Sequence, residues 1–152
     1  MDISKLILQI QYVLAPAIMV SSAALLLLGI QNKFSNLASR FRSLNSEKRA
    51  LNLITERSPL EEQRLKNLQE QIHRLMKRAG AVKNAILCLY FSIVVFMGTS
   101  ILIFLNVYAN FQLYHLIVAV FVAGLLAVMA GCLFIVFETI LFYTVIRLEQ
   151  TS

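Results

Sequence analysis

The chain has 152 residues, of which 59% are hydrophobic and only 14% are charged. The charged residues lie between two long apolar regions, because residues 10–30 and 85–137 contain none. Uncharged runs of this length exclude an ordinary soluble domain, since crossing a bilayer core takes about 20 apolar residues. The composition therefore predicts an integral membrane protein.

The first uncharged run has the length of one membrane-spanning helix, and the second has the length of two. A short polar and aromatic break divides the second run at Asn106, Tyr108, Asn110 and Gln112, and it suits a turn at the membrane interface. We therefore expect an all-α membrane protein with three transmembrane helices, at about residues 10–30, 86–107 and 113–137.

The distribution of basic residues predicts the orientation. The segment from Lys33 to Lys83 carries twelve Lys and Arg against five Glu, whereas the first few residues are neutral. Since Lys and Arg are retained on the cytoplasmic side, this segment and the C-terminus should be cytoplasmic, and the N-terminus and the 106–112 turn should be outside. The net charge of +6 is therefore interpreted as a sign of membrane topology before it is taken as a sign of any binding partner. The neutral start also argues against a cleavable signal peptide.

Apolar residues in the basic segment recur at steps of three and four, the spacing of one helical face. They are Phe34, Leu37, Phe41 and Leu44 after the first span, and Leu65, Leu68, Ile72, Leu75, Ala79, Val82 and Ile86 before the second. The pattern predicts an antiparallel coiled-coil hairpin over about residues 32–84, continuous with helices 1 and 2.

The hairpin should contain a turn at 56–58. Ser58, Pro59 and Glu61 form a capping box that starts its second arm. The periodicity weakens between residues 45 and 55, where helical order is expected to be lower. Residues 1–152 should therefore be a single domain with a membrane part and a cytoplasmic part.

One face of the second span is polar along its whole length. Its members are Asn84, Cys88, Ser92, Thr99 and Asn106. One interpretation is that this stripe lines a water-filled path between subunits. The other is that the hydroxyl groups bond their own helix carbonyls or hold neighbouring helices. The stripe contains no charge that would set ion selectivity.

The third span carries small residues four positions apart, namely Ala119, Ala123, Ala127 and Gly131. Small side chains let helices approach closely in lipid, so this face should pack against the other two spans or against a second subunit. The opposite side is predicted to face lipid, through Phe121, Val122, Leu125, Val128, Met129, Leu133 and Val136.

Glu138 follows the small residues on that face. An ionisable residue at the membrane edge is a candidate for function. The alternative is an interfacial ion pair with a base such as Lys33, Lys83 or Arg147. The basic residues beside the inner leaflet, Lys33, Lys77, Arg78 and Lys83, are expected to contact anionic lipid headgroups.

Signatures of enzymes are missing, and we expect no catalytic activity, metal or cofactor. His73 and His115 lie in different parts of the predicted fold, and Cys88 and Cys132 fall within spans without ligand spacing. The sequence has no phosphate-binding loop. We do not expect nucleic-acid binding, because the basic segment has no interleaved aromatic platform and its charges are spread around a hairpin.

Several residues together resemble a family of small bacterial inner-membrane proteins catalogued only as a domain of unknown function. They are Pro16, Ser21, Leu25–Leu28, Asn32, Lys33, Arg40, Arg42 and Leu44. Members carry Asn-Arg where this chain has Asn32-Lys33. The resemblance implies a bacterial inner membrane and assigns no activity. The layout is also similar to the membrane-insertase superfamily, which often has a basic residue within the membrane, and this chain has none there.

We therefore expect a homo-oligomer whose most concrete candidate activity is a channel or pore for ions or small solutes. Such a pore requires an oligomer, because three spans can hardly enclose one. The alternatives are a membrane chaperone or insertase, and a structural scaffold that recruits a cytoplasmic protein partner through the hairpin.

Overall fold

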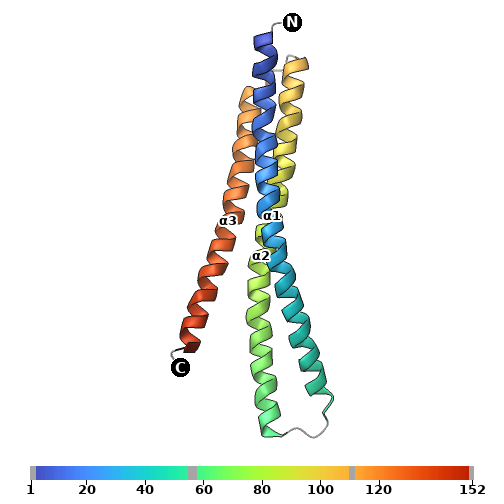
Figure 1. Ribbon diagram of the computed structural model, residues 1–152, viewed down its shortest axis with the longest axis vertical. Coiled ribbons are helices and arrows are strands. Elements are labelled where there is room, and N and C mark those ends of the chain that lie inside the picture. The colour runs from blue at the N-terminus through green and yellow to red at the C-terminus, as the bar shows by residue number, and fades with distance from the viewer. Residues whose placement is uncertain (1–2, 55–57, 110–111, 151–152) are drawn as a thin grey trace.

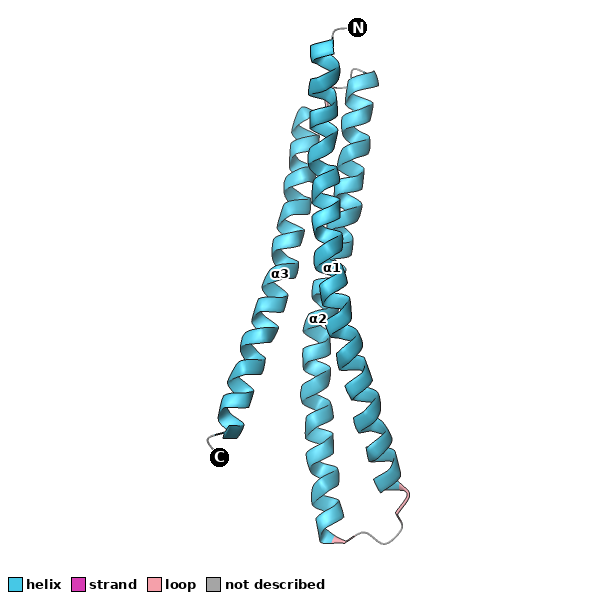
Figure 2. Ribbon diagram, viewed as in Figure 1, coloured by secondary structure: helices cyan, strands magenta, loops and turns pink. Residues whose placement is uncertain are grey.

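The computed structural model describes residues 3–54, 58–109 and 112–150, and all regular structure in these ranges is helical (Figure 2). The three helices are α1 (Ile3–Asn52), α2 (Pro59–Ala109) and α3 (Tyr114–Gln150). Each contains a stretch long and apolar enough to cross a membrane. The expectation of an all-α chain with three helices of membrane-spanning length is thus confirmed.

Helices α1 and α2 continue without interruption beyond their apolar parts. α1 has 50 residues and α2 has 51, and their charged halves extend past α3 as an antiparallel hairpin (Figure 1). The prediction of weak helical order from residue 45 is wrong, because α1 continues to Asn52. Leu44, Lys48 and Leu51 keep the three-four spacing there and remain half-buried, so packing on α2 continues to the end of α1.

The start of α2 is fixed by the predicted capping box. The Ser58 backbone N–H donates to Glu61 Oε2 at 2.8 Å, and the Glu61 N–H donates to Ser58 Oγ at 3.4 Å. Pro59 is the first helical residue, where its missing N–H costs no hydrogen bond. Most of the predicted 56–58 turn lies outside the described residues.

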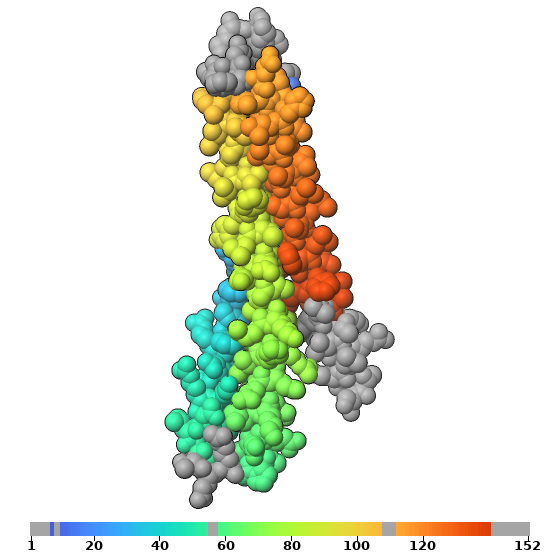
Figure 3. All heavy atoms as spheres, turned by 180° about the vertical axis from the view of Figure 1, so that it is seen from behind, coloured from blue at the N-terminus to red at the C-terminus, as the bar shows by residue number. Residues whose placement is uncertain are grey.

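α2 is the central helix of the bundle and packs against both α1 and α3 (Figure 3). On one side Leu37 of α1 is buried together with Leu75 and Val82 of α2. On another side the ring of Phe96 in α2 meets that of Phe121 in α3, with centroids 5.6 Å apart. The two halves of the chain are therefore joined through α2.

α3 packs on α2 through two glycines. A Cβ atom at Gly124 would lie 2.8 Å from the Phe96 ring, and one at Gly131 would lie 3.2 Å from Leu89 Cγ. The buried and half-buried positions around these glycines follow steps of three and four: Ile117, Phe121, Gly124, Val128, Gly131, Ile135 and Glu138. Close approach of the two helices thus depends on glycine at both positions.

The predicted small-residue face is partly wrong. Gly131 is buried and Ala127 half-buried, but Ala119 and Ala123 are exposed. Steps of four residues advance about 40° around a helix each time, so Ala119 and Gly131 point about 120° apart. Steps that alternate three and four stay on one face. For the same reason Phe121 and Val128, predicted to face lipid, are half-buried.

Candidate functional site

A buried carboxylate on α3 forms the centre of the candidate site. Glu138 follows Gly131 by seven residues, so the seam that packs α3 on α2 also turns Glu138 inward. Its side chain is only 1% exposed. Glu138 is thus enclosed by the bundle at the point where the uncharged run of α3 ends.

Two bases from two other helices bind this carboxylate. Lys33 Nζ of α1 donates to Glu138 Oε2 at 2.5 Å. Arg78 of α2 donates from Nε to Glu138 Oε1 at 3.0 Å, and its Nη2 lies 3.0 Å from the same oxygen. Lys33 also donates to Thr139 Oγ1 at 3.3 Å. We call Lys33, Arg78 and Glu138 the ion cluster, and it joins all three helices.

The ion cluster is asymmetric in charge and exposure. Lys33 and Arg78 are 37% and 25% exposed, whereas Glu138 is almost completely covered. Removing a carboxylate from water costs several kcal/mol unless bases and hydrogen bonds compensate it. Two bases against one acid leave a net charge of +1, and this excess lies on the more exposed side of the cluster. The arrangement is suited to fastening helices and to attracting an anion.

One of the two partners of Glu138 was predicted from the sequence. Of the three bases considered, Lys33 binds Glu138, Lys83 is exposed, and the side chain of Arg147 lies outside the described part of α3. Arg78, which the sequence predicts to contact lipid headgroups, binds Glu138. The contact between Arg78 and Glu138 follows from the way that α2 and α3 pack. Ala85 of α2 lies against Gly131 of α3. Arg78 precedes Ala85 by seven residues and Glu138 follows Gly131 by seven, so the two side chains meet about two helical turns further along the same contact.

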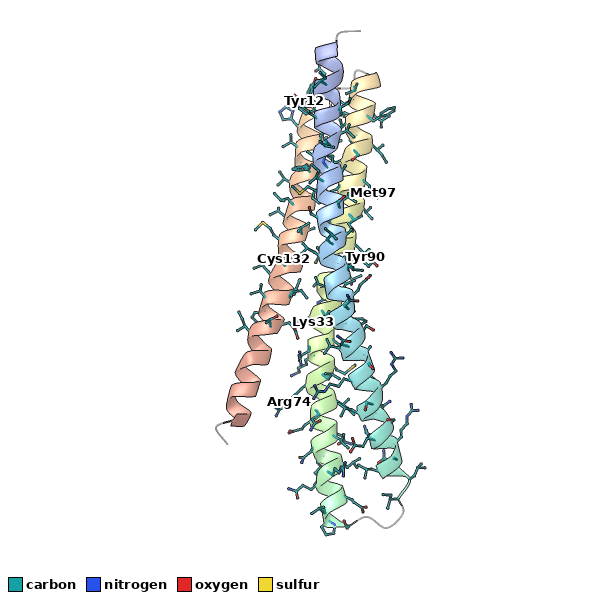
Figure 4. The ribbon with its side chains drawn as sticks, in the orientation of Figure 1. Tyr12, Lys33, Arg74, Tyr90, Met97 and Cys132 are labelled. Carbon is teal, nitrogen blue, oxygen red and sulfur yellow. The ribbon has the colours of Figure 1, made fainter. Side chains whose placement is uncertain are left out.

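The remaining predicted headgroup contacts, Lys77 and Lys83, are both exposed on α2. Figure 4 labels Lys33 on the middle part of α1, between the apolar and the charged halves of the helix. The four predicted bases therefore divide into two that bind Glu138 and two that lie on the surface.

The polar stripe of α2 is turned largely into the bundle. Ser92 and Thr99 are 0% and 1% exposed, and their hydroxyls donate to the carbonyls of Leu89 and Val95 at 2.7 and 2.9 Å. Hydroxyls satisfied by their own helix need no water. This geometry supports the helix-packing interpretation of the stripe.

The other members of the stripe have separate environments. Asn106 Oδ1 accepts a hydrogen bond from the Leu113 N–H at 3.1 Å and thereby ties the end of α2 to the start of α3. Cys88 is half-buried and Asn84 is exposed. The stripe is thus not one continuous polar surface.

Polar contacts that the sequence analysis did not identify join α1 to α2. Gln31 Nε2 donates to the Tyr90 hydroxyl at 2.7 Å, and the side chain of Arg64 binds Glu47 Oε1 through Nη2 at 2.6 Å. Within α2, Glu62 and Glu70 pair with the bases four residues later, Lys66 and Arg74. The first two contacts join α1 to α2, whereas the exposed pairs within α2 add little stability.

Potential metal ligands are dispersed over the described residues. No three His, Cys, Asp or Glu side chains within the described ranges gather closely enough to hold a metal ion. Cys88 and Cys132 are free thiols, and His73 and His115 are exposed on different helices. Among the described residues, the ion cluster is therefore the candidate site.

Comparison with known proteins gives one relationship. Residues 13–148 match the family described as Protein of unknown function (DUF2721). No curated protein and no solved structure matches the chain.

Proposed function

The chain belongs to the DUF2721 family, and because that membership assigns no activity, we propose a function from the geometry: a membrane-anchored scaffold. In this proposal the three helices cross a bacterial inner membrane, and the hairpin of residues 32–84 is a cytoplasmic docking arm for a protein partner. The N-terminus and the 106–112 turn lie outside and the C-terminus lies inside, as the distribution of Lys and Arg favours.

The observation that carries the proposal is the continuity of α1 and α2. Both helices pass from the apolar into the charged part without a break, and the ion cluster fastens α3 where the charged part begins. From Lys33 to Asn52 the arm is about 30 Å long, at about 1.5 Å per residue. In this proposal, partner binding at the tip of the hairpin shifts the membrane part as well, because the same two helices form both.

The end of the hairpin has features of a contact surface. Leu53 and Leu60 flank the connection between α1 and α2 and are 84% and 78% exposed. Contiguous exposed apolar patches mark contact sites for other proteins, so the proposal requires that Leu53 and Leu60 contribute to one such patch. Their position at the tip supports a docking role for the hairpin.

The alternatives have less support. A homo-oligomeric pore relied on the polar stripe, and its central hydroxyls are buried and bonded within α2. An insertase needs a polar groove open to the membrane, and the same buried Ser92 and Thr99 do not provide one. The scaffold alternative requires only the continuous hairpin.

Site-specific photo-crosslinking in cells tests the docking arm. A photoreactive residue at position 53 or 60 should give an adduct of discrete mass, because these positions are at the exposed tip. Position 25 is the matched control, since Leu25 is 71% exposed on the apolar part of α1. Adducts absent from the tip, or identical at all three positions, would contradict the proposal.

Cysteine labelling tests the orientation separately. In a Cys88→Ser, Cys132→Ser background, a membrane-impermeant maleimide should label Gln112→Cys in intact spheroplasts and Ser58→Cys only in inverted vesicles. The reverse pattern would invert the proposed topology.

A further inference from the structure

Four bases gather at one end of the apolar part of the bundle. We call Lys33, Lys77, Arg78 and Lys83 the junction bases. Residues 3–46 contain no acid, and neither do residues 71–137, so Glu138 is the acid that lies among them. Four bases against one acid give a local net charge of +3.

Packing places the junction bases at similar depth along the bundle. Leu37 of α1 is buried with Val82 of α2 in the same cluster, so Lys33 lies about one helical turn from Leu37 and near the level of Lys83. Arg78 and Lys33 meet at Glu138, and Lys77 is next to Arg78. The charge is therefore concentrated in a layer.

The aromatic residues at the other end locate this layer relative to a bilayer. Tyr12 and Tyr114 are 59% and 66% exposed, and tyrosines with a wet hydroxyl are typical of the membrane interface (Figure 4 labels Tyr12). At about 1.5 Å per residue, Lys33 lies about 32 Å from Tyr12, and Glu138 lies about 36 Å from Tyr114. The hydrocarbon core is about 30 Å thick, and the headgroups extend the bilayer to about 40–45 Å. The layer thus coincides with the headgroups.

Two exposed bases of α1, Arg42 and Arg49, lie well beyond this layer. Arg42 and Arg49 follow Lys33 by nine and sixteen residues, or about 14 and 24 Å along α1. Both are exposed. Because interactions between exposed charges are screened within about 8–10 Å, they are too distant to attract headgroups strongly.

We propose that the junction bases form a binding site for the headgroup phosphate of anionic phospholipids in the adjacent leaflet. The proposal rests on the membrane placement of the proposed function and not on the docking role of the hairpin. Glu138 neutralises one charge of the Lys33 and Arg78 pair, and exposed Lys77 and Lys83 add two more. An anionic headgroup complements the remaining positive charge.

Spin-labelled lipids test the site in the reconstituted full-length protein. The wild type should associate with spin-labelled phosphatidylglycerol several-fold more strongly than with spin-labelled phosphatidylcholine. Each base near an anionic surface contributes roughly a fivefold change in binding, so Lys77→Gln with Lys83→Gln should remove most of this preference. Both positions are exposed, and the change should leave folding intact.

The matched control is Arg42→Gln with Arg49→Gln, which removes the same charge from the distant part of the hairpin. It should preserve the lipid preference within about twofold. Absence of a preference in the wild type, or an equal loss in both double variants, would overturn the site. If the protein instead fails to remain in vesicles after carbonate extraction, the membrane placement itself fails.

Discussion

The ammonium group of Lys33 and the carboxylate of Glu138 are 105 positions apart in the chain and meet in an ion pair of 2.5 Å. α1 and α3 each pack mainly on α2, so this pair connects two helices that have little other contact. Arg78 binds the second oxygen of the same carboxylate from α2. Four predictions follow from this arrangement and from the packing around it.

Glu138→Gln should reduce the free energy of unfolding by about 2 kcal/mol. Removing one partner of a buried ion pair typically costs more, but Lys33 and Arg78 are partly exposed and can be rehydrated. The measurement is denaturant unfolding of the protein in detergent. The control Glu62→Gln breaks only an exposed pair and should cost less than about 0.5 kcal/mol. Equal effects of both substitutions would show that the cluster does not fasten the helices.

Lys33→Met and Arg78→Met should be non-additive. Each single variant leaves Glu138 one base and should cost about 1 kcal/mol, whereas the double variant leaves a buried, unpaired carboxylate. We expect the double variant to lose at least about 1 kcal/mol more than the sum, as measured in a double-mutant cycle. Arg64→Met combined with Arg78→Met is the control and should be additive, since Arg64 binds Glu47 elsewhere in the hairpin.

Gly124→Ala should destabilise the contact between α2 and α3 by about 1–3 kcal/mol. The added methyl group would lie 2.8 Å from Phe96, whose ring is buried against Phe121 and has little room to move. Gly98→Ala is the matched control, because no atom lies within 4 Å of a Cβ there. Thermal unfolding in detergent should separate the two variants, and similar melting temperatures would contradict the close approach at Gly124.

Thr99→Val should change stability by less than about 1 kcal/mol and should not create or abolish solute flux in liposomes. Valine has nearly the same shape, and the lost hydrogen bond goes only to the carbonyl of Val95 in the same helix. Ser92→Ala should behave similarly. A wild-type flux that either substitution alters would restore the pore interpretation of the stripe.

The helices were predictable because their signals are local. The length of each uncharged run predicts a span, and Ser58, Pro59 and Glu61 predict the start of α2 to the residue. The heptad spacing before the second span predicts that α2 continues through it. Such patterns depend on the chain within a few turns and need no knowledge of its partners.

The faces of α3 were harder to predict because they depend on α2. A row of small residues at four-residue spacing looks continuous in sequence, yet Ala119 and Ala123 turn away from the contact that Gly124 and Gly131 make. In the sequence, Arg78 does not differ from the other bases near the membrane interface. Only the alignment of α2 with α3 places it beside Glu138. Contacts between side chains of different helices depend on how the two helices are aligned. The spacing of residues within one helix does not give this alignment.

The position of Glu138 on α3, the third helix in chain order, also bears on biosynthesis. A ribosome synthesises Lys33 and Arg78 long before Glu138, so both bases lack this carboxylate until α3 has been made. The last helix then supplies the one negative charge that both bases share. A chain truncated before residue 138 would retain the uncharged runs of all three helices but leave Lys33 and Arg78 without the carboxylate that they share.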